Sequence, residues 1–417
     1  MIKVVWFSSL EFSVNPIKRT GTWLQPLAEE LVKTKKVELY NITRNNKRKN
    51  LTSQCFNNIK QWVFPECTQT SKLKESISVC KQVKKILDEI HPDIVHVWGT
   101  ESSWLSVYTQ GYIKYPCFCD IQGLKSAYIP FYFGGLTFKE ILCSSWGYFE
   151  LLNPRKSLPL KFLHWKHLGK IEISRLSHLK YISVQSQWTE IQLTSFLPNA
   201  KFVHTGIILR DEFYKAKQWE THNHTSPRLF SSAYGLDLPY KGLLTLLKSL
   251  SIIKKFYPEV HLNLAGPSLA NIKQKNGYTK LIDKFIKENN LHSNITFLDA
   301  LTAEEIIVQL QNCDVCIVPS YVETYCLAFA ESMILGTPTI ATYSGALPEL
   351  AECNQEAAFY NANDYRMLAI QTIKIFEDKE FAQNLSSRSR ARRFKDNDKN
   401  LIVNNQIEIY RYIIDNY

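Results

Sequence analysis

The clearest structural pattern in the chain is the run Pro319-Ser-Tyr-Val-Glu-Thr-Tyr-Cys-Leu-Ala-Phe-Ala-Glu-Ser-Met-Ile-Leu-Gly-Thr-Pro338. The apolar, β-branched residues before it, 315–318, predict a strand that ends at Pro319. A loop holding Glu323 follows, and then a helix that carries Glu331 and ends near Gly336, with a proline just beyond. Strand, loop and helix in this order form the repeating unit of a parallel α/β sheet.

The same alternation of short apolar runs and longer helix-period segments extends along the 417 residues. It predicts an α/β fold with two Rossmann-like, doubly wound domains that face each other across a cleft. We expect an N-terminal domain over residues 1–210, a linker over 211–227, a C-terminal domain over 228–395, and a C-terminal helix over 396–417 that packs back toward the N-terminal domain. The predicted strands cover 2–7, 37–42, 93–98, 117–121, 181–184 and 201–204 in the first half, and 228–232, 261–265, 295–298, 315–318, 337–342 and 357–360 in the second.

The spacing of the two glutamates limits what they can do. Over a fully helical interval Glu323 and Glu331 would be offset by about 12 Å, which is too far for two carboxylates to share a metal or flank one glycosidic bond. They could hold opposite ends of one elongated ligand. The backbone amides of Thr324, Tyr325, Cys326 and Leu327 open the helix, and a helix N-terminus is a natural partner for a diphosphate. Spacing alone is equally consistent with a helix-end charge at Glu323 and a surface residue at Glu331.

Several further motifs occur in an order that resembles the retaining glycosyltransferases of family 4, which are nucleotide-sugar enzymes of the GT-B architecture among the group 1 glycosyl transferases. Besides Glu-x7-Glu, the pattern includes Glu331-Ser-Met-Ile-Leu-Gly-Thr-Pro338, Ile340-Ala-Thr-Tyr-Ser-Gly-Ala-Leu-Pro-Glu349, Lys241-Gly242 before a long helix, and His91-Pro-Asp-Ile-Val-His-Val-Trp-Gly99. The resemblance spans nearly the whole chain and is most specific over residues 228–350.

The resemblance implies roles for individual residues. Glu331 would bind the ribose hydroxyls, Glu323 would lie near the donor sugar, and Lys241 would meet the diphosphate. The pair Gly21-Thr22, which opens the helix after a long first loop, would approach phosphate or acceptor. A fixed cation and oriented amides are enough to stabilise the charge on a leaving diphosphate, so no metal and no cofactor is expected. The expected donor is a nucleoside diphosphate sugar, with UDP slightly favoured over GDP.

This sequence departs from the family pattern at three places. The family usually has an arginine shortly before the Lys-Gly pair, whereas residues 231–241 contain none. Gln122 stands where a histidine often lies opposite the donor sugar, and glutamine cannot act as an acid or base near neutral pH. Cys326 occupies the position of the usual glycine three residues after Glu323. Glu323, Lys241 and Gln122 are nevertheless the residues from which we expect catalysis.

Charge is distributed unevenly between the two halves. The chain has a net charge of +11, and residues 1–210 hold 28 Lys+Arg against 15 Asp+Glu, so the excess lies entirely in the first half. This indicates an anionic partner, and the alternation of lysines with apolar residues over 160–171 would suit an anionic lipid surface as well as a solvated helix. No signature of a nucleic-acid module accompanies it. The ten cysteines are expected to be reduced thiols. Asp396-Asn-Asp398 has the residues of an Asp-x-Asp metal motif but lies in a polar, lysine-rich tract rather than at a strand end, so we expect no metal there.

The predicted function is transfer of a sugar, with retention, to a saccharide or lipid-linked saccharide acceptor bound by the N-terminal domain, as in polysaccharide or glycan assembly. The protein would be cytoplasmic, and its basic first half would allow a peripheral position on the inner face of the membrane. Two alternatives stay open: a non-catalytic scaffold or subunit of the same fold, and another nucleotide-sugar enzyme such as an epimerase.

Overall fold

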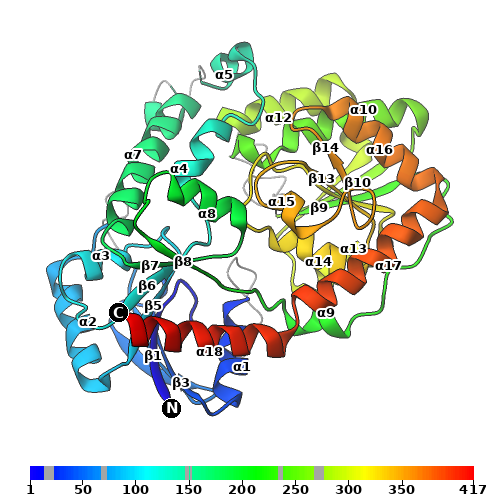
Figure 1. Cartoon of the computed structure of the whole chain (residues 1–417). Coiled ribbons are helices and arrows are strands. Elements are labelled where there is room, and N and C mark those ends of the chain that lie inside the picture. Colours follow the sequence, from blue (N-terminus) through cyan, green and yellow to red (C-terminus); the bar gives the residue numbers. More distant parts are fainter. Residues whose placement is uncertain (14–22, 67–72, 146–149, 151–152, 233–237, 267–276) are drawn as a thin grey trace. The chain divides into compact units, whose positions relative to one another are not determined.

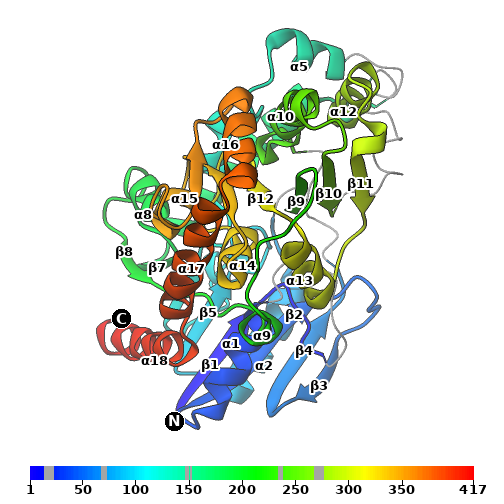
Figure 2. The same cartoon turned by 90° about the vertical axis from the view of Figure 1, so that its right-hand side faces the viewer.

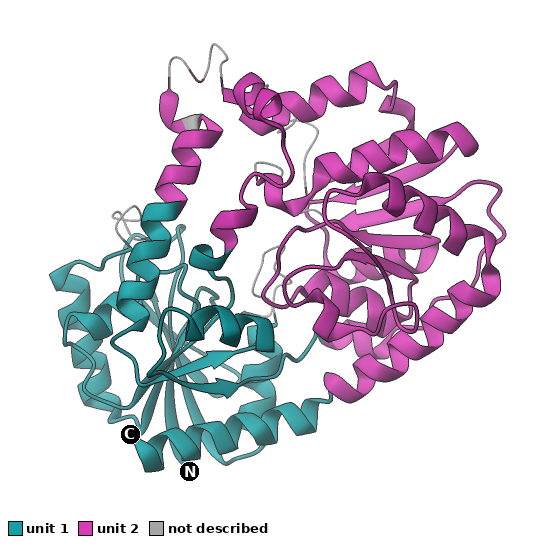
Figure 3. Cartoon of the chain, turned by 45° about the horizontal axis from the view of Figure 1, so that its top comes forward, with its two compact units in different colours: residues 1–127, 166–210, 397–417 teal, residues 128–165, 211–396 magenta. Residues whose placement is uncertain are grey.

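The computed structural model describes residues 1–13, 23–66, 73–145, 150, 153–232, 238–266 and 277–417. The chain divides into two compact units (Figure 3). Unit 1 comprises residues 1–127, 166–210 and 397–417, and unit 2 comprises residues 128–165 and 211–396. None of the described helices has both the length and the apolar character that crossing a bilayer requires.

Unit 1 is built on a sheet whose order is β3-β4-β2-β1-β5-β6-β7-β8. All its neighbours pair in parallel except β3 with β4, which are antiparallel. The chain begins in the middle at β1, moves to one edge, and returns beside β1 as β5, so the strand order reverses between β1 and β5. Its strands are β1 Ile2–Phe7, β2 Val37–Arg44, β3 Thr52–Phe56, β4 Ile59–Phe64, β5 Ile94–Trp98, β6 Cys117–Asp120, β7 Tyr181–Val184 and β8 Lys201–His204.

Helices cover both faces of this sheet. The core on one face joins the strands to α2 Ile77–Ile90, α3 Leu105–Thr109 and α8 Gln187–Thr194. On the other face, α1 Leu24–Lys33 contacts the C-terminal helix α18 Lys399–Asn416 (Figure 1). Helix α18 is fixed by Tyr410, whose hydroxyl accepts a 2.9 Å hydrogen bond from Trp6 Nε1 in β1. The end of the chain is therefore an integral part of unit 1.

Unit 2 is a parallel sheet with the order β11-β10-β9-β12-β13-β14, so its strand order reverses between β9 and β12. Helices α10, α12 and α16 lie on one face, and α13, α14 and α17 on the other (Figures 1 and 2). The strands are β9 Arg228–Ser232, β10 His261–Ala265, β11 Ile295–Leu298, β12 Val315–Val318, β13 Thr339–Thr342 and β14 Ala358–Tyr360. The helices are α9 Asp211–Lys215, α10 Leu243–Phe256, α12 Gly277–Glu288, α13 Ala303–Asn312, α14 Leu327–Leu335, α15 Leu347–Leu350, α16 Tyr365–Glu377 and α17 Lys379–Asp396, with 3-10 turns η4 Pro239–Lys241 and η5 His292–Asn294.

The unit boundaries differ from the domain boundaries expected from the sequence. Residues 128–165, placed by the sequence in the N-terminal domain, belong to unit 2, because Phe133, Leu136 and Leu158 pack on its apolar core. This excursion contains η2 Ile129–Phe131, α5 Phe138–Ser145 and η3 Pro154–Lys156; α4 Lys125–Tyr128 and α7 Leu158–Leu176 run across the two boundaries.

The expected linker, 211–227, also belongs to unit 2. It is held by Trp219, which is 3% exposed. The backbone N–H of Trp219 donates to Leu335 O at 2.8 Å, and its indole N–H donates to Cys313 O at 2.7 Å. The side chain of Trp219 thus anchors residues 211–227, which the sequence predicts to be a linker, to unit 2.

Candidate active site

The candidate site lies at the carboxyl ends of β9 and β12, where the strand order of unit 2 reverses. Ligands of doubly wound sheets bind at such a reversal, because the loops on either side separate there. Turn η4 follows β9 and brings Lys241 to this end, whereas residues 319–326, here called the donor loop, follow β12 and bring Glu323. Residues about 80 positions apart in sequence meet for this topological reason.

Lys241 and Glu323 form an ion pair, with 2.6 Å between Nζ and Oε1. The lysine side chain is 25% exposed and the glutamate side chain 12% exposed, so both remain accessible from one side. Burial acts to lower the pKa of Lys241, but the attraction and hydrogen bond of the Glu323 carboxylate outweigh it and raise that pKa above its ordinary value. Lys241 is therefore a fixed cation throughout the physiological pH range.

Backbone hydrogen bonds hold the donor loop in place. Glu323 O accepts from Ala346 N at 2.9 Å, and Tyr321 N donates to Tyr240 O at 2.7 Å, which ties the loop to the turn that carries Lys241. The N–H of Thr324 donates to the hydroxyl of Tyr128 at 3.1 Å. Both partners of the ion pair thus sit on backbone that is hydrogen-bonded to its surroundings.

Helix α14 starts directly after the donor loop and carries Glu331 one helical turn from Leu327. Side chains on a helix lean toward its N-terminus, so Glu331 lies on the side of the donor loop. Although it is a carboxylate, it is only 7% exposed. The first amides of α14 have no acceptor within the helix, and its dipole favours an anion at that end. The amides and the dipole at this end of α14 therefore favour a ligand with a negative group there.

Cys326, the N-cap of α14, has φ +90°, a backbone conformation that side chains other than glycine's rarely adopt. Burial, followed by the nearby Glu323 carboxylate, raises the pKa of its thiol above the ordinary value, which disfavours the thiolate form. Its position matters through the backbone, because φ +90° is a conformation that glycine adopts at little cost.

This strain gives a direct prediction. Cys326→Gly and Cys326→Ala both remove the thiol, but only glycine adopts the native φ without cost. The glycine variant should be more stable than the alanine variant by about 1 kcal/mol, measured as protection of α14 amides in hydrogen exchange. Equal protection in the two variants would show that this backbone is not strained.

The structure brings together most, but not all, of the residues predicted from sequence. Lys241, Glu323, Glu331 and the amides of residues 324–327 share one edge of unit 2. Gln122 lies in unit 1, just after β6. Gly21 and Thr22 lie outside the described residues, and their role stays a prediction.

Sequence reasoning missed an aromatic cluster that supports the site, formed by Tyr128, Trp165 and Tyr240. The ring centroids of Tyr128 and Tyr240 are 5.5 Å apart, and those of Trp165 and Tyr240 are 5.4 Å apart. Tyr240 directly precedes Lys241, and Tyr128 holds the donor loop. The only sequence signal was an unusually aromatic stretch starting at Tyr128, which did not reveal its partner.

In unit 1, Asp120 lies at the carboxyl end of β6, two residues before Gln122. It is fully buried, and its carboxylate accepts hydrogen bonds of 2.9 Å from Ser183 Oγ and from Gln185 Nε2. Burial raises the pKa of Asp120 to about 8 despite these two bonds. Its carboxyl group is therefore largely protonated in the folded protein near neutral pH.

The raised pKa predicts a pH-dependent stability of unit 1. Because the folded protein binds this proton more tightly than the unfolded chain, whose Asp pKa is about 4, the free energy of unfolding falls as pH rises from about 4 to about 8, by at most about 1.4 kcal/mol per pH unit. Asp120→Asn keeps a neutral group with similar hydrogen bonding and should flatten this slope. Hydrogen exchange of the β6 amides between pH 5 and 8, corrected for intrinsic exchange rates, measures this slope. Identical slopes in the wild type and in Asp120→Asn would contradict the raised pKa of Asp120.

Comparison with known proteins finds a family that resembles most of unit 2. Residues 217–392 match the family described as glycosyl transferases group 1. The match covers most of unit 2. Among curated proteins, an uncharacterized glycosyltransferase, YqgM, of Bacillus subtilis is 30% identical over 191 residues, which are 45% of this chain and 50% of that protein. D-inositol 3-phosphate glycosyltransferase of Mycobacterium leprae is 29% identical over 130 residues, 29% of each chain. The matches thus span half or less of these relatives.

Solved structures of glycosyltransferases share the fold. Sucrose-phosphate synthase of Thermosynechococcus elongatus superposes with a TM-score of 0.76 at 15% identity over 100% of both chains. The HepE protein of Anabaena, solved in complex with UDP-glucose, superposes with a TM-score of 0.66 at 15% identity over 98% of both chains. The expected GT-B class of fold, with two Rossmann-like sheets, is confirmed. The membership of family 4 in particular stays a prediction.

Proposed function

We propose that the protein is a metal-independent, retaining glycosyltransferase of family 4 that transfers a sugar from a nucleoside diphosphate sugar to a saccharide or lipid-linked saccharide. The observation that carries the proposal is the 2.6 Å pair of Lys241 and Glu323 at the strand reversal of a group 1 glycosyl transferase domain. UDP is the proposed donor nucleotide, in keeping with the UDP-glucose bound by the HepE protein. Polysaccharide assembly at the inner face of the membrane would be its setting.

The donor would be held by three elements of unit 2. Lys241 would place its fixed positive charge against the diphosphate, the first amides of α14 would add oriented dipoles, and Glu331 would accept hydrogen bonds from the ribose hydroxyls. Glu323 would orient the donor sugar while keeping Lys241 charged and in position. A pre-positioned cation of this kind stabilises the charge that develops on a leaving diphosphate without a divalent metal.

Retention then requires no protein base. The bond between the anomeric carbon and the diphosphate oxygen breaks, the acceptor hydroxyl oxygen bonds to that carbon on the same face, and the acceptor's proton passes to the leaving phosphate oxygen. This fits a site in which Cys326 remains a thiol and Gln122 cannot titrate.

Product stereochemistry tests the proposal. UDP-, GDP- and ADP-sugars with α-linked donors are incubated with the protein in EDTA, with and without a panel of saccharide acceptors, and followed by proton NMR. We expect the first product from one donor to be the α anomer. A first-formed β anomer would contradict retention, and turnover that needs a divalent metal would contradict the metal-free mechanism. Nucleotide binding without turnover of any donor would favour the non-catalytic scaffold.

A further inference from the structure

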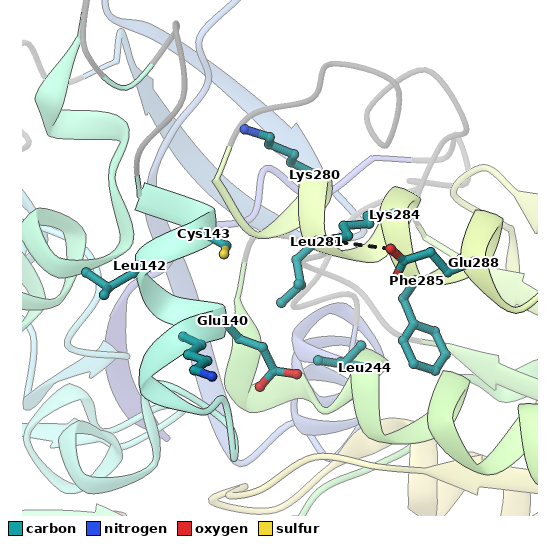
Figure 4. A pocket seen from close by; sticks show the side chains of 10 residues that line it. Glu140, Leu142, Cys143, Leu244, Lys280, Leu281, Lys284, Phe285 and Glu288 are labelled. Atoms are coloured by element: carbon teal, nitrogen blue, oxygen red, sulfur yellow. Dashed lines mark ion pairs between the residues drawn. The ribbon is translucent and has the colours of Figure 1, made fainter.

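Unit 2 contains a pocket between α5, α12 and the start of α10 (Figure 4). Its volume is about 770 Å³, within the range of small-molecule sites. In Figure 4 the side chains of Cys143, Leu244 and Leu281 point toward the same space, and Phe285 lines it from α12. The interior is therefore apolar and large enough for a hydrocarbon chain.

The charged residues of the pocket are mostly lysines. Lys139 comes from α5, and Lys280 and Lys284 come from α12. Lys284 pairs with Glu288 at 3.6 Å, and both side chains are more than half exposed. Among the described residues, neither Lys139 nor Lys280 forms an ion pair.

The other acid of the lining, Glu140, is already paired with a lysine. Its Oε1 lies 3.1 Å from Lys248 Nζ, and its Oε2 accepts from Thr137 N at 2.7 Å. Burial acts to raise the pKa of Glu140, but these hydrogen bonds and the lysine lower it below its ordinary value, so Glu140 stays charged and engaged. The lining thus has a positive charge excess above an apolar interior.

From this combination we infer that the pocket binds a single-chain anionic amphiphile, with its hydrocarbon chain on Leu244, Leu281 and Phe285 and its phosphate or carboxylate head at the edge of the pocket that carries Lys280. Each methylene buried on such a surface strengthens binding about fourfold, whereas a free anion would meet only exposed lysines. The site is separate from the Lys241–Glu323 pair. Binding at this pocket requires neither a nucleotide sugar nor turnover, so the inference can be tested independently of the proposed function.

Calorimetric titration below the micellar concentration tests the inference with three probes. Dodecyl phosphate should bind one to one, and dodecylphosphocholine, which has the same chain and phosphate without net charge, at least ten times more weakly. Inorganic phosphate should show no measurable binding. Equal affinity for the two amphiphiles would refute the role of the lysines, and absence of binding by both would refute the site.

Variants separate the two parts of the pocket. Lys280→Glu should weaken dodecyl phosphate at least tenfold and leave dodecylphosphocholine unchanged, and Leu281→Gln should weaken both. Lys255→Glu, an exposed lysine elsewhere on α10, is the matched control and should change neither.

The wild-type chain provides a test that needs no substitution. Cys143 is exposed and lines the pocket, whereas Cys55 and Cys353 are exposed elsewhere. Dodecyl phosphate should slow the reaction of Cys143 with N-ethylmaleimide several-fold, read by peptide mass spectrometry, and leave Cys55 and Cys353 unaffected. Equal protection of all three thiols, or of none, would place the amphiphile outside this pocket.

Discussion

Lys241→Ala should lower kcat/KM for sugar transfer by about 10² to 10³-fold, the usual effect of removing one fixed group that stabilises developing charge. The substitution deletes the cation that would face the diphosphate and leaves the Glu323 carboxylate, 12% exposed, without the lysine that now neutralises it. That carboxylate would repel the donor's phosphates, so the loss should appear in donor binding as well as in the chemical step.

Two further variants control this result. Lys255→Ala removes an exposed lysine on the helix that follows Lys241 and should leave kcat/KM unchanged. The double variant Lys241→Ala with Glu323→Gln removes the uncompensated charge and should recover part of the donor affinity but not the rate. Wild-type kinetics in Lys241→Ala, with the donor shown to bind, would remove this lysine from the mechanism.

Gly242→Ala should have the largest structural effect, destabilising unit 2 by about 3 kcal/mol or more. Gly242 has φ +76°, and a Cβ added there would lie 1.9 Å from Pro319 O, which is backbone at the start of the donor loop. Since Gly242 follows Lys241 directly, the displacement would also separate Lys241 from Glu323 and weaken nucleotide binding.

Gly111→Ala is the matched control for this substitution. Gly111 has nearly the same φ, +79°, but an added Cβ meets nothing within 4 Å, so only the backbone cost of about 1 kcal/mol remains. A chain of two units need not unfold in one step, so stability is measured locally by hydrogen exchange. The amides of β9 and β12 report on Gly242→Ala, and those of β5 and β6 report on Gly111→Ala. Equal losses in the two variants would show that the close approach of Gly242 to the donor loop does not matter.

Most of the strands could be predicted because each is a short run rich in apolar residues within a parallel sheet. The exception is the β3–β4 hairpin. Strand β3, Thr-Ser-Gln-Cys-Phe, is polar and lies at the sheet edge, so hydrophobicity did not reveal it. The remaining signal was the turn, where Asn57 and Asn58 both have positive φ, as asparagine tolerates in tight hairpins.

The candidate site was only partly predictable for a different reason. Glu323, Glu331 and Lys241 lie in motifs with a fixed local spacing, so the sequence identified them. Tyr128 supports the donor loop from almost 200 residues away. Residues 128–165 pack on the core of unit 2, but the apolar character of a residue does not indicate which of two cores it joins.

The measurement that tests the central claim most directly is a calorimetric titration of UDP, GDP and ADP, in EDTA, into the wild-type protein, Lys241→Ala and Glu331→Ala. We predict that UDP binds the wild type most tightly, and that each substitution weakens it by about 30 to 150-fold, as expected for loss of one charged contact of about 2–3 kcal/mol. Failure of all three nucleotides to bind the wild type, or unchanged UDP affinity in both variants, would contradict a donor site at this edge of unit 2.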